Sequence, residues 1–142
     1  MSIVASIAAA TAIAFADHMA YLRPLSMLET GNNDYAVGTA GERSRWQIRK
    51  TTWRKYTKMS FDRAINPEIA AVVASAHVQY LRDKLTTAYG GREPSPAQLY
   101  CAWNMGLTGF RRRQYLVSRC PAAVQERAER YANLYADLKY NQ

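Results

Sequence analysis

A helix start signal in the middle of the chain does most to limit the possible folds. Asn66-Pro67-Glu68 combines an N-cap asparagine, a proline at the first helical position and an acid in the first turn. The pattern predicts a helix that reaches about Tyr89, before Gly90-Gly91. Its expected apolar face consists of Ile69, Val72, Val73, Ala76 and Tyr80.

Other segments carry similar helical signals on both sides of this helix. We expect one helix from about Asp17 to Thr30, where Gly31 is the stop, and a short one through Trp53 and Tyr56. Thr51 or Thr52 is the expected N-cap of the short helix.

The C-terminal part of the chain contains two more start signals. Ser95-Pro96 precedes a predicted helix that ends near Gly106, and Pro121 opens the last one. The last helix has Val124, Ala128, Tyr131, Leu134 and Leu138 on one face. The sequence has no repeat and no convincing alternating pattern of a strand, so it predicts a mainly α fold. Residues 31–50 are the exception, since their Gly, Asn and Thr residues predict a long loop or a short irregular hairpin.

Length and composition indicate one domain with an anionic partner. The chain has 142 residues, of which 49% are apolar, and this is enough to bury a core without metals. Its net charge is +8, which fits nucleic acid, an acidic membrane surface or the bacterial cell wall. The basic run Arg111-Arg112-Arg113 could contact anionic wall groups or nucleic acid, or could simply be a solvated face.

The first sixteen residues have the composition of a secretory signal peptide. They contain no charged side chain, are apolar from Ile3 to Phe15, and end in an A-x-A cleavage pattern before Asp17. The run has about 14 apolar residues against the ~20 that span a bilayer, so we expect no stable membrane insertion. The n-region lacks Lys and Arg, and an uncleaved first helix remains the alternative. The division is therefore a signal peptide at 1–16 and one domain at 17–142, in a periplasmic or secreted protein.

Two cysteines and several aromatic residues allow further expectations. In an oxidising compartment Cys101 and Cys120 would pair, closing a loop worth about 3 kcal/mol, and the alternative is two buried free thiols. Among the aromatic residues that could stack on a sugar we favour Trp46 and Trp103. No spacing of Cys and His indicates a metal site, and no motif indicates a cofactor.

Glu29 breaks a local rule. A helix C-terminus carries partial negative charge, so a carboxylate in the last turn, just before Gly31, is disfavoured. The apolar neighbours Leu25, Met27 and Leu28 would partly exclude water, and both effects would raise the pKa of its carboxyl group. An acid that keeps its proton near neutral pH can protonate a leaving-group oxygen, as glycoside cleavage requires. Most glutamates at helix ends are nevertheless solvated and have no function.

The sequence around Glu29 resembles a known family of wall-cleaving domains. The segment "ETGNNDYAVGTAGERSRWQI" is similar to the pattern E-S-G-x-N-P-x-A-V-S-x-x-G-x-x-G-L-M-Q-I of the lytic transglycosylase domain in the lysozyme-like superfamily (glycoside hydrolase family 23 type). The matching positions are Glu29, Gly31, Asn33, Ala36, Val37, Gly41, Gln47 and Ile48. The segment "CAWNMGLTGF" resembles the family's A-Y-N-A-G-P, with Trp103 in the tyrosine place, and "NPEIAAVVASAHVQYLRDKL" is similar to the helix between the two motifs. The resemblance covers about residues 21–135.

The resemblance implies a lysozyme-like α-helical domain with a groove for peptidoglycan. Glu29 would be the single acid/base that cleaves the bond between N-acetylmuramic acid and N-acetylglucosamine and leaves a 1,6-anhydro product. Gln47 and Asn104 would hold the sugar, and Tyr131 would correspond to the tyrosine that approaches the acid. The implied partner is the glycan strand, with no nucleic acid, no cofactor and a monomeric state; the small size suits a secretion, pilus or phage machine.

Some positions depart from the family pattern and leave alternatives open. Ser44, Arg45 and Trp46 stand where the family has glycine, leucine and methionine, so the strip beside the groove is bulkier and more basic. This favours the alternative of a wall-binding or assembly protein without catalysis. Asp34 stands in the proline place, and a carboxylate there could activate water and make the protein a hydrolase; a solvated loop aspartate is the plainer alternative.

Overall fold

The protein is built from helices joined by short turns and one long loop. The computed structural model describes the backbone of residues 3–141 and the side chains of residues 17–141. Its elements are α1 (Ile3–Thr30), α2 (Lys50–Tyr56), the 3-10 helix η1 (Phe61–Ile65), α3 (Pro67–Ala88), α4 (Pro96–Arg112), the 3-10 helix η2 (Val117–Arg119) and α5 (Ala122–Tyr140). The predicted mainly α fold is confirmed, and within the described residues the only β pairing consists of two isolated bridges in the long loop, Val37 with Arg43 and Arg43 with Ile48.

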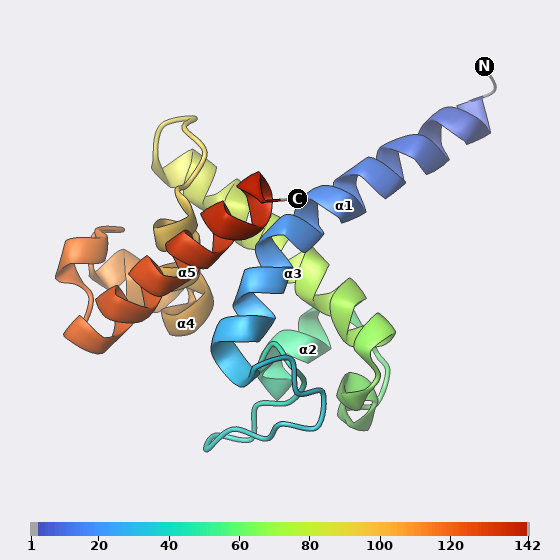
Figure 1. Cartoon of the computed structure of the whole chain (residues 1–142), viewed down its shortest axis with the longest axis horizontal. Coiled ribbons are helices and arrows are strands. Elements are labelled where there is room, and N and C mark those ends of the chain that lie inside the picture. The colour runs from blue at the N-terminus through green and yellow to red at the C-terminus, as the bar shows by residue number, and fades with distance from the viewer. Residues whose placement is uncertain (1–2, 142) are drawn as a thin grey trace.

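The helices pack around one core. α1 packs against α3 and α5, α4 packs against both α3 and α5, and α2 lies on α3 (Figure 1). The largest side chains of this core are Trp46, Trp53, Tyr100, Tyr131 and Phe110, all at most 2% exposed. Four of them come from the long loop, α4 and α5, so the core ties the loop to helices that are far away in sequence.

The first helix begins earlier than the sequence analysis predicts. We expected a start near Asp17, whereas α1 is continuous from Ile3 to Thr30. Figure 1 shows its N-terminal part extending away from the other helices. The expected signal peptide falls mostly on this part, and its cleavage stays a prediction. No helix among the described residues is sufficiently long and apolar to cross a membrane.

The central helix α3 begins and ends where its signals predict. The Asn66 side chain accepts hydrogen bonds from the backbone N–H groups of Glu68 and Ile69, and Pro67 is the first helical residue. The predicted apolar face is partly wrong, because Val72 is 64% exposed and Tyr80 is 38% exposed. The buried face is instead Ala70, Ala71, Val73, Ala74, Ser75, Val78, Leu81 and Leu85. Its small residues are well suited to close helix packing, which a search for long apolar side chains overlooks.

Two other helices differ in detail from the prediction. Thr51 and Thr52 lie inside α2, whose N-cap is Arg49 without a side-chain cap hydrogen bond. The predicted end near Gly106 is a kink, since Gly106 has φ 74° and α4 continues beyond it to Arg112. A φ in this region favours glycine, which explains why the stop signal was strong although the helix continues.

Candidate functional site

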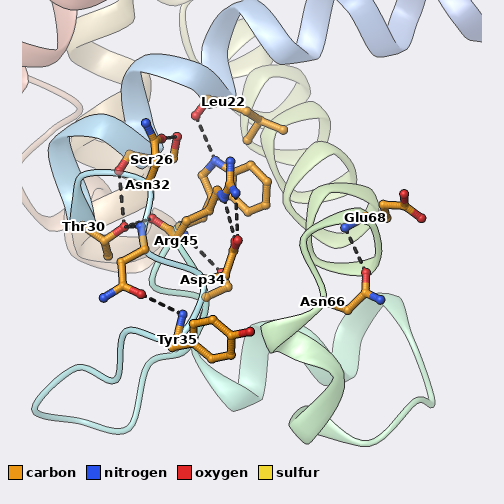
Figure 2. A network of polar contacts seen from close by, with 12 residues as sticks. Leu22, Ser26, Thr30, Asn32, Asp34, Tyr35, Arg45, Asn66 and Glu68 are labelled. Carbon is orange, nitrogen blue, oxygen red and sulfur yellow. Dashed lines mark hydrogen bonds and ion pairs between the residues drawn. The ribbon is translucent and has the colours of Figure 1, made fainter.

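The end of α1 and the loop after it are fixed by a network of polar contacts. The chain leaves α1 through an αL-type cap, in which Gly31 has φ 62° and its backbone N–H donates to the carbonyl of Met27 at 3.1 Å. The Thr30 hydroxyl donates to the carbonyl of Arg45 at 2.9 Å, which joins the end of α1 to the second half of the loop (Figure 2). Residue 29, one position before the turn, is therefore held in a defined place.

Glu29 is anchored through one of its two carboxylate oxygens. Its side chain is 13% exposed, and its Oε1 accepts a hydrogen bond from the Tyr100 hydroxyl at 3.0 Å. Arg127 Nη2 lies 3.2 Å from the same oxygen. Within the described side chains, no hydrogen bond or ion pair involves Oε2, so this oxygen is available to a ligand. The sequence predicted apolar residues and a tyrosine around Glu29, but not this cation on α5.

Tyr100 connects the residues around the carboxylate. Its hydroxyl donates to Glu29 and accepts from Asn104 Nδ2 at 3.3 Å and from Arg127 Nε at 2.8 Å. Burial is the main reason why the pKa of Tyr100 rises to about 12, so the hydroxyl keeps the proton that it donates. Tyr100 and Asn104 are four residues apart in α4 and therefore share one face of that helix.

A cavity of about 450 Å³ opens beside Glu29. Its walls come from the end of α1, the long loop, α2, α3 and α4. Glu29, Gln47, Asn104 and Trp103, all proposed as site residues from the sequence, line it together. Trp103 is half-buried and its ring lies 5.2 Å from that of His77, another wall residue. The cavity therefore brings together polar side chains that are far apart in the sequence, since Glu29 and Asn104 are separated by 75 positions.

Trp46 and Ser44 do not belong to the cavity, so their assignment as substrate-binding residues is wrong. Trp46 is 2% exposed and its indole Nε1 donates to the carbonyl of Leu22 at 2.8 Å, and Ser44 is fully buried. The Ser44 hydroxyl accepts from the Trp46 backbone N–H at 3.1 Å. Because the indole finds its partner inside α1, the loop strip packs into the core instead of facing a ligand.

Tyr131 is also a core residue and not the tyrosine beside the acid. It is 1% exposed, and its hydroxyl donates to the carbonyl of Tyr21 at 2.9 Å. Its ring lies 5.6 Å from that of Tyr100, which occupies the place next to Glu29. The tyrosine that contacts Glu29 therefore comes from α4, and the ring of Tyr131 packs against it.

Asp34 is not placed to activate water. Arg45 donates to both of its carboxylate oxygens, at 2.6 and 2.8 Å, and Asp34 is not among the residues that line the cavity (Figure 2). The second carboxylate of the cavity is Glu42, which the sequence analysis missed. Its side chain is 18% exposed, its Oε2 accepts from the Ala40 backbone N–H at 3.0 Å, and Arg49 Nε lies 3.9 Å from its Oε1.

Gly38 lets two polar side chains of the cavity lie close to the backbone. A Cβ atom at this position would lie 2.2 Å from Glu42 Oε2 and 2.6 Å from Gln47 Oε1. The Gln47 side-chain nitrogen donates to the carbonyls of Ala36 and Ser44, at 3.3 and 3.1 Å. Gln47 thus stabilises the loop with its amide nitrogen and directs its oxygen toward Gly38.

The α2 and α3 wall of the cavity carries a histidine that stays neutral. His77 Nδ1 lies 2.8 Å from the Tyr56 hydroxyl, and its ring packs against Tyr80 and Trp103. Burial, followed by the positive charge of Lys55, lowers the pKa of His77 to about 4. At neutral pH this wall therefore presents a neutral imidazole beside a lysine.

The two cysteines are free thiols, so the expected disulfide is absent. Both are buried, Cys101 in α4 and Cys120 just before α5. Burial, with the neighbouring Cys120 thiol, raises the pKa of Cys101 to about 12. Of the two outcomes considered from the sequence, the structure has the buried thiols.

No group of three or more His, Cys, Asp or Glu side chains that could hold a metal occurs in the described part of the chain. Comparisons with family models, with curated proteins and with solved structures find no match for this chain.

Proposed function

We propose that the protein is a lytic transglycosylase that cleaves the glycan strands of peptidoglycan, with Glu29 as the single acid/base. One observation carries the proposal: Glu29, Gln47 and Asn104 line the same cavity although they come from α1, the long loop and α4. These are the three positions at which the sequence resembles the acid and the sugar-holding residues of that family. A solvated glutamate would need neither an anchored oxygen nor a shared cavity.

The geometry around Glu29 suits both proton transfers of such a reaction. Protonated Glu29 gives its proton to the glycosidic oxygen, and the bond from that oxygen to the muramoyl C1 breaks. The carboxylate that remains is stabilised by Tyr100 and Arg127, both of which contact Oε1. It then takes the proton of the muramoyl C6 hydroxyl while the C6 oxygen bonds to C1. The ring product contains no added water, and Glu29 returns to its protonated form.

A hydrolase is the second candidate, because Glu42 lines the same cavity as Glu29. A second carboxylate can take a proton from water that attacks C1, provided that a water molecule fits between it and the sugar. Asp34, which the sequence analysis considered for this role, is bound to Arg45. If the protein hydrolyses its substrate, we assign the water-activating role to Glu42.

Product analysis tests both candidates in one experiment. Purified peptidoglycan is digested with the wild-type protein and with Glu42→Gln, and the released muropeptides are analysed by mass spectrometry. Anhydro ends from both proteins support transglycosylation with Glu29 alone. Reducing ends from the wild type that are lost in Glu42→Gln support hydrolysis. No release by a folded wild-type protein that still binds peptidoglycan would leave the wall-binding alternative and contradict both enzyme proposals.

A further inference from the structure

A dense cluster of cations lies on α2 and its two flanks. Five of the ten residues from Arg49 to Lys58 are basic and none is acidic. These are Arg49, Lys50, Arg54, Lys55 and Lys58, and all of them are exposed. The three-arginine run at the end of α4, which the sequence analysis singled out, is shorter and does not line the cavity beside Glu29.

The cluster borders two cavities. Arg49 and Lys55 line the cavity that contains Glu29. Lys50, Arg54 and Lys58 line a second cavity of about 520 Å³, between α2 and η1. α2 is thus the wall that separates the two cavities, with positive charge on both of its sides.

The second cavity is lined by four cations and by one acid, which forms an ion pair with only one of them. Its one acid is Asp62, and Arg43 donates to that carboxylate at 2.6 Å. The contact with Arg43 is the main reason why the pKa of Asp62 lies below its usual range, with a smaller contribution from the charge of Lys50, so this carboxylate is charged and already paired. Among the described side chains, no ion pair involves Lys50, Arg54 or Lys58. Lys50 and Arg54 are also four residues apart on one helix, a spacing at which like charges repel. An external anion would relieve this repulsion.

The position of the second cavity indicates where the anion comes from. A glycan strand in the cavity of Glu29 carries short peptides on its muramoyl residues, and these peptides bear free carboxylates. α2 has only seven residues and, like any helix with its side chains, is about 10 Å across, so an extended peptide of a few residues can reach past it from one cavity to the other. Carboxylates accept hydrogen bonds from Lys and from Arg, the side chains that this cavity offers.

We propose that Lys50, Arg54 and Lys58 form a subsite for the carboxylates of the peptide stems, next to the catalytic cavity. This inference rests on the proposed function, since it requires a glycan strand beside α2. It assigns to the protein a preference for strands that carry peptides over naked glycan. Because the cations are exposed, the preference weakens as salt concentration rises.

The test compares two substrates and two double variants. The substrates are purified peptidoglycan with intact peptide stems and the same material after an amidase has removed the stems. The variants are Arg54→Gln with Lys58→Gln, and, as a control of equal charge change, Arg111→Gln with Arg112→Gln. Both replaced pairs are exposed, and neither lies in the cavity of Glu29. The rates of glycan cleavage are measured at low salt, and the folded state of each variant is verified by circular dichroism.

We expect the wild type and the α4 control to cleave the stem-bearing strands about five-fold faster than naked glycan, as two exposed ion pairs would allow. Arg54→Gln with Lys58→Gln should cleave both substrates at the rate of naked glycan. Equal rates for the two substrates in the wild type, or a preference that survives in the α2 variant, would overturn the proposal.

Binding separates failure of this inference from failure of the proposed function. If the wild type cleaves neither substrate, the enzyme proposal fails, and co-sedimentation with the insoluble stem-bearing material, with the soluble stem-free strands as competitor, still measures the subsite. Stem-dependent sedimentation that only the α2 variant loses supports the subsite. Binding to DNA that is lost in this variant, with unchanged binding to stem-bearing peptidoglycan, would overturn it in favour of nucleic acid.

Discussion

At the scale of single residues, the Tyr100 hydroxyl is the contact that joins the candidate site together. It holds Glu29 and accepts hydrogen bonds from Asn104 and Arg127. Each of these three side chains could adopt other rotamers. The hydrogen bond to the shared buried hydroxyl holds each of them in one direction. We therefore regard Tyr100 as a positioning residue and not as the acid itself.

Tyr100→Phe should slow glycan cleavage while leaving substrate affinity nearly unchanged. The substitution removes one of the two contacts to Glu29 Oε1 and leaves the Arg127 guanidinium with one partner fewer. We expect kcat to fall about ten-fold with little change in KM, which corresponds to ~1.4 kcal/mol of lost positioning. Steady-state kinetics checks this expectation, with Tyr35→Phe, which is 76% exposed, as the control. A wild-type kcat in Tyr100→Phe would contradict the role of Tyr100.

Individual site residues differ in how well the sequence could predict them. Glu29 was found because a carboxylate in the last turn of a helix breaks a local preference. Arg127 could not be found this way, since α5 meets α1 only in the folded chain and an arginine on an exposed helix face is ordinary. Trp46 was misplaced because sequence does not reveal whether an aromatic residue has an internal hydrogen-bond partner, here the Leu22 carbonyl.

At the scale of elements, the loop of residues 31–49 determines the shape of the cavity. Its polar composition predicted an irregular segment. The Thr30 hydroxyl bonds the end of α1 to the second half of the loop, in which the backbones of Arg43 and Ile48 pair with each other. The composition did not predict that the second half of the loop packs into the core through Trp46. Because Ser44, Trp46 and Ile48 are buried, this half of the loop can hold Glu42 and Gln47 in fixed positions.

Gly38→Ala should strongly slow glycan cleavage while it lowers the free energy of unfolding only slightly. The added Cβ would collide with Glu42 Oε2 and Gln47 Oε1, so both side chains must move away from the backbone. These atoms are the ends of flexible side chains, and we expect the free energy of unfolding to fall by at most about 1 kcal/mol. Cleavage should fall by an order of magnitude or more, because Gln47 lines the cavity of Glu29.

Val37→Ala is the control for this variant, since Val37 is the adjacent residue and is 69% exposed. Urea unfolding and the cleavage assay are run on both variants. If Gly38→Ala retains wild-type cleavage, Glu42 and Gln47 do not need their observed positions, and the role of the loop is wrong.

The helices were easier to predict than their packing. Start and stop signals are local, and those of α3 gave both ends of that helix correctly. Which face becomes buried depends on the neighbouring helices, so the alanine face of α3 was missed. The kink at Gly106 illustrates the same limit, because one glycine can end a helix or redirect it.

At the scale of the whole molecule, His77 makes stability depend on pH. Its pKa is lowered from 6.5 to about 4 in the folded protein, so the unfolded chain binds more protons between these two values. Stability is therefore full above about pH 6.5, decreases as the pH falls, and reaches its lower level near pH 4. The size of this contribution is about 3 kcal/mol at most, from 1.36 kcal/mol per pH unit.

The contribution of His77 is obtained by comparison with His77→Gln, which keeps a polar partner for the Tyr56 hydroxyl. The free energy of unfolding of both proteins is measured in urea from pH 7.5 to pH 4. All other groups titrate alike in the two proteins, so the difference between the two free energies isolates the contribution of His77. We expect the wild type to lose stability more steeply than the variant over this range. Parallel curves would mean that His77 is not buried as the structure shows.

The architecture joins a core of packed helices to one cavity at the end of α1. The sequence predicts that the core is built from packed helices, since amphipathic helices must bury their apolar faces against one another. The cavity is predictable only at the positions where the sequence resembles a known family, namely Glu29, Gln47, Asn104 and Trp103. The cationic wall on α2 was not singled out from the sequence, because a charge run alone is most often a solvated face.

The central claim is that the Glu29 carboxyl group performs the proton transfers, and removing its acidity tests it most directly. Glu29→Gln keeps the size of the side chain and an oxygen for Tyr100, and Glu129→Gln on the exposed side of α5 is the matched control. Both proteins are incubated with purified peptidoglycan, and the released muropeptides are quantified. We predict that Glu29→Gln, folded and still binding peptidoglycan, releases at least about a hundred-fold less than the wild type, while Glu129→Gln equals it. Release by Glu29→Gln at the wild-type rate would contradict the account.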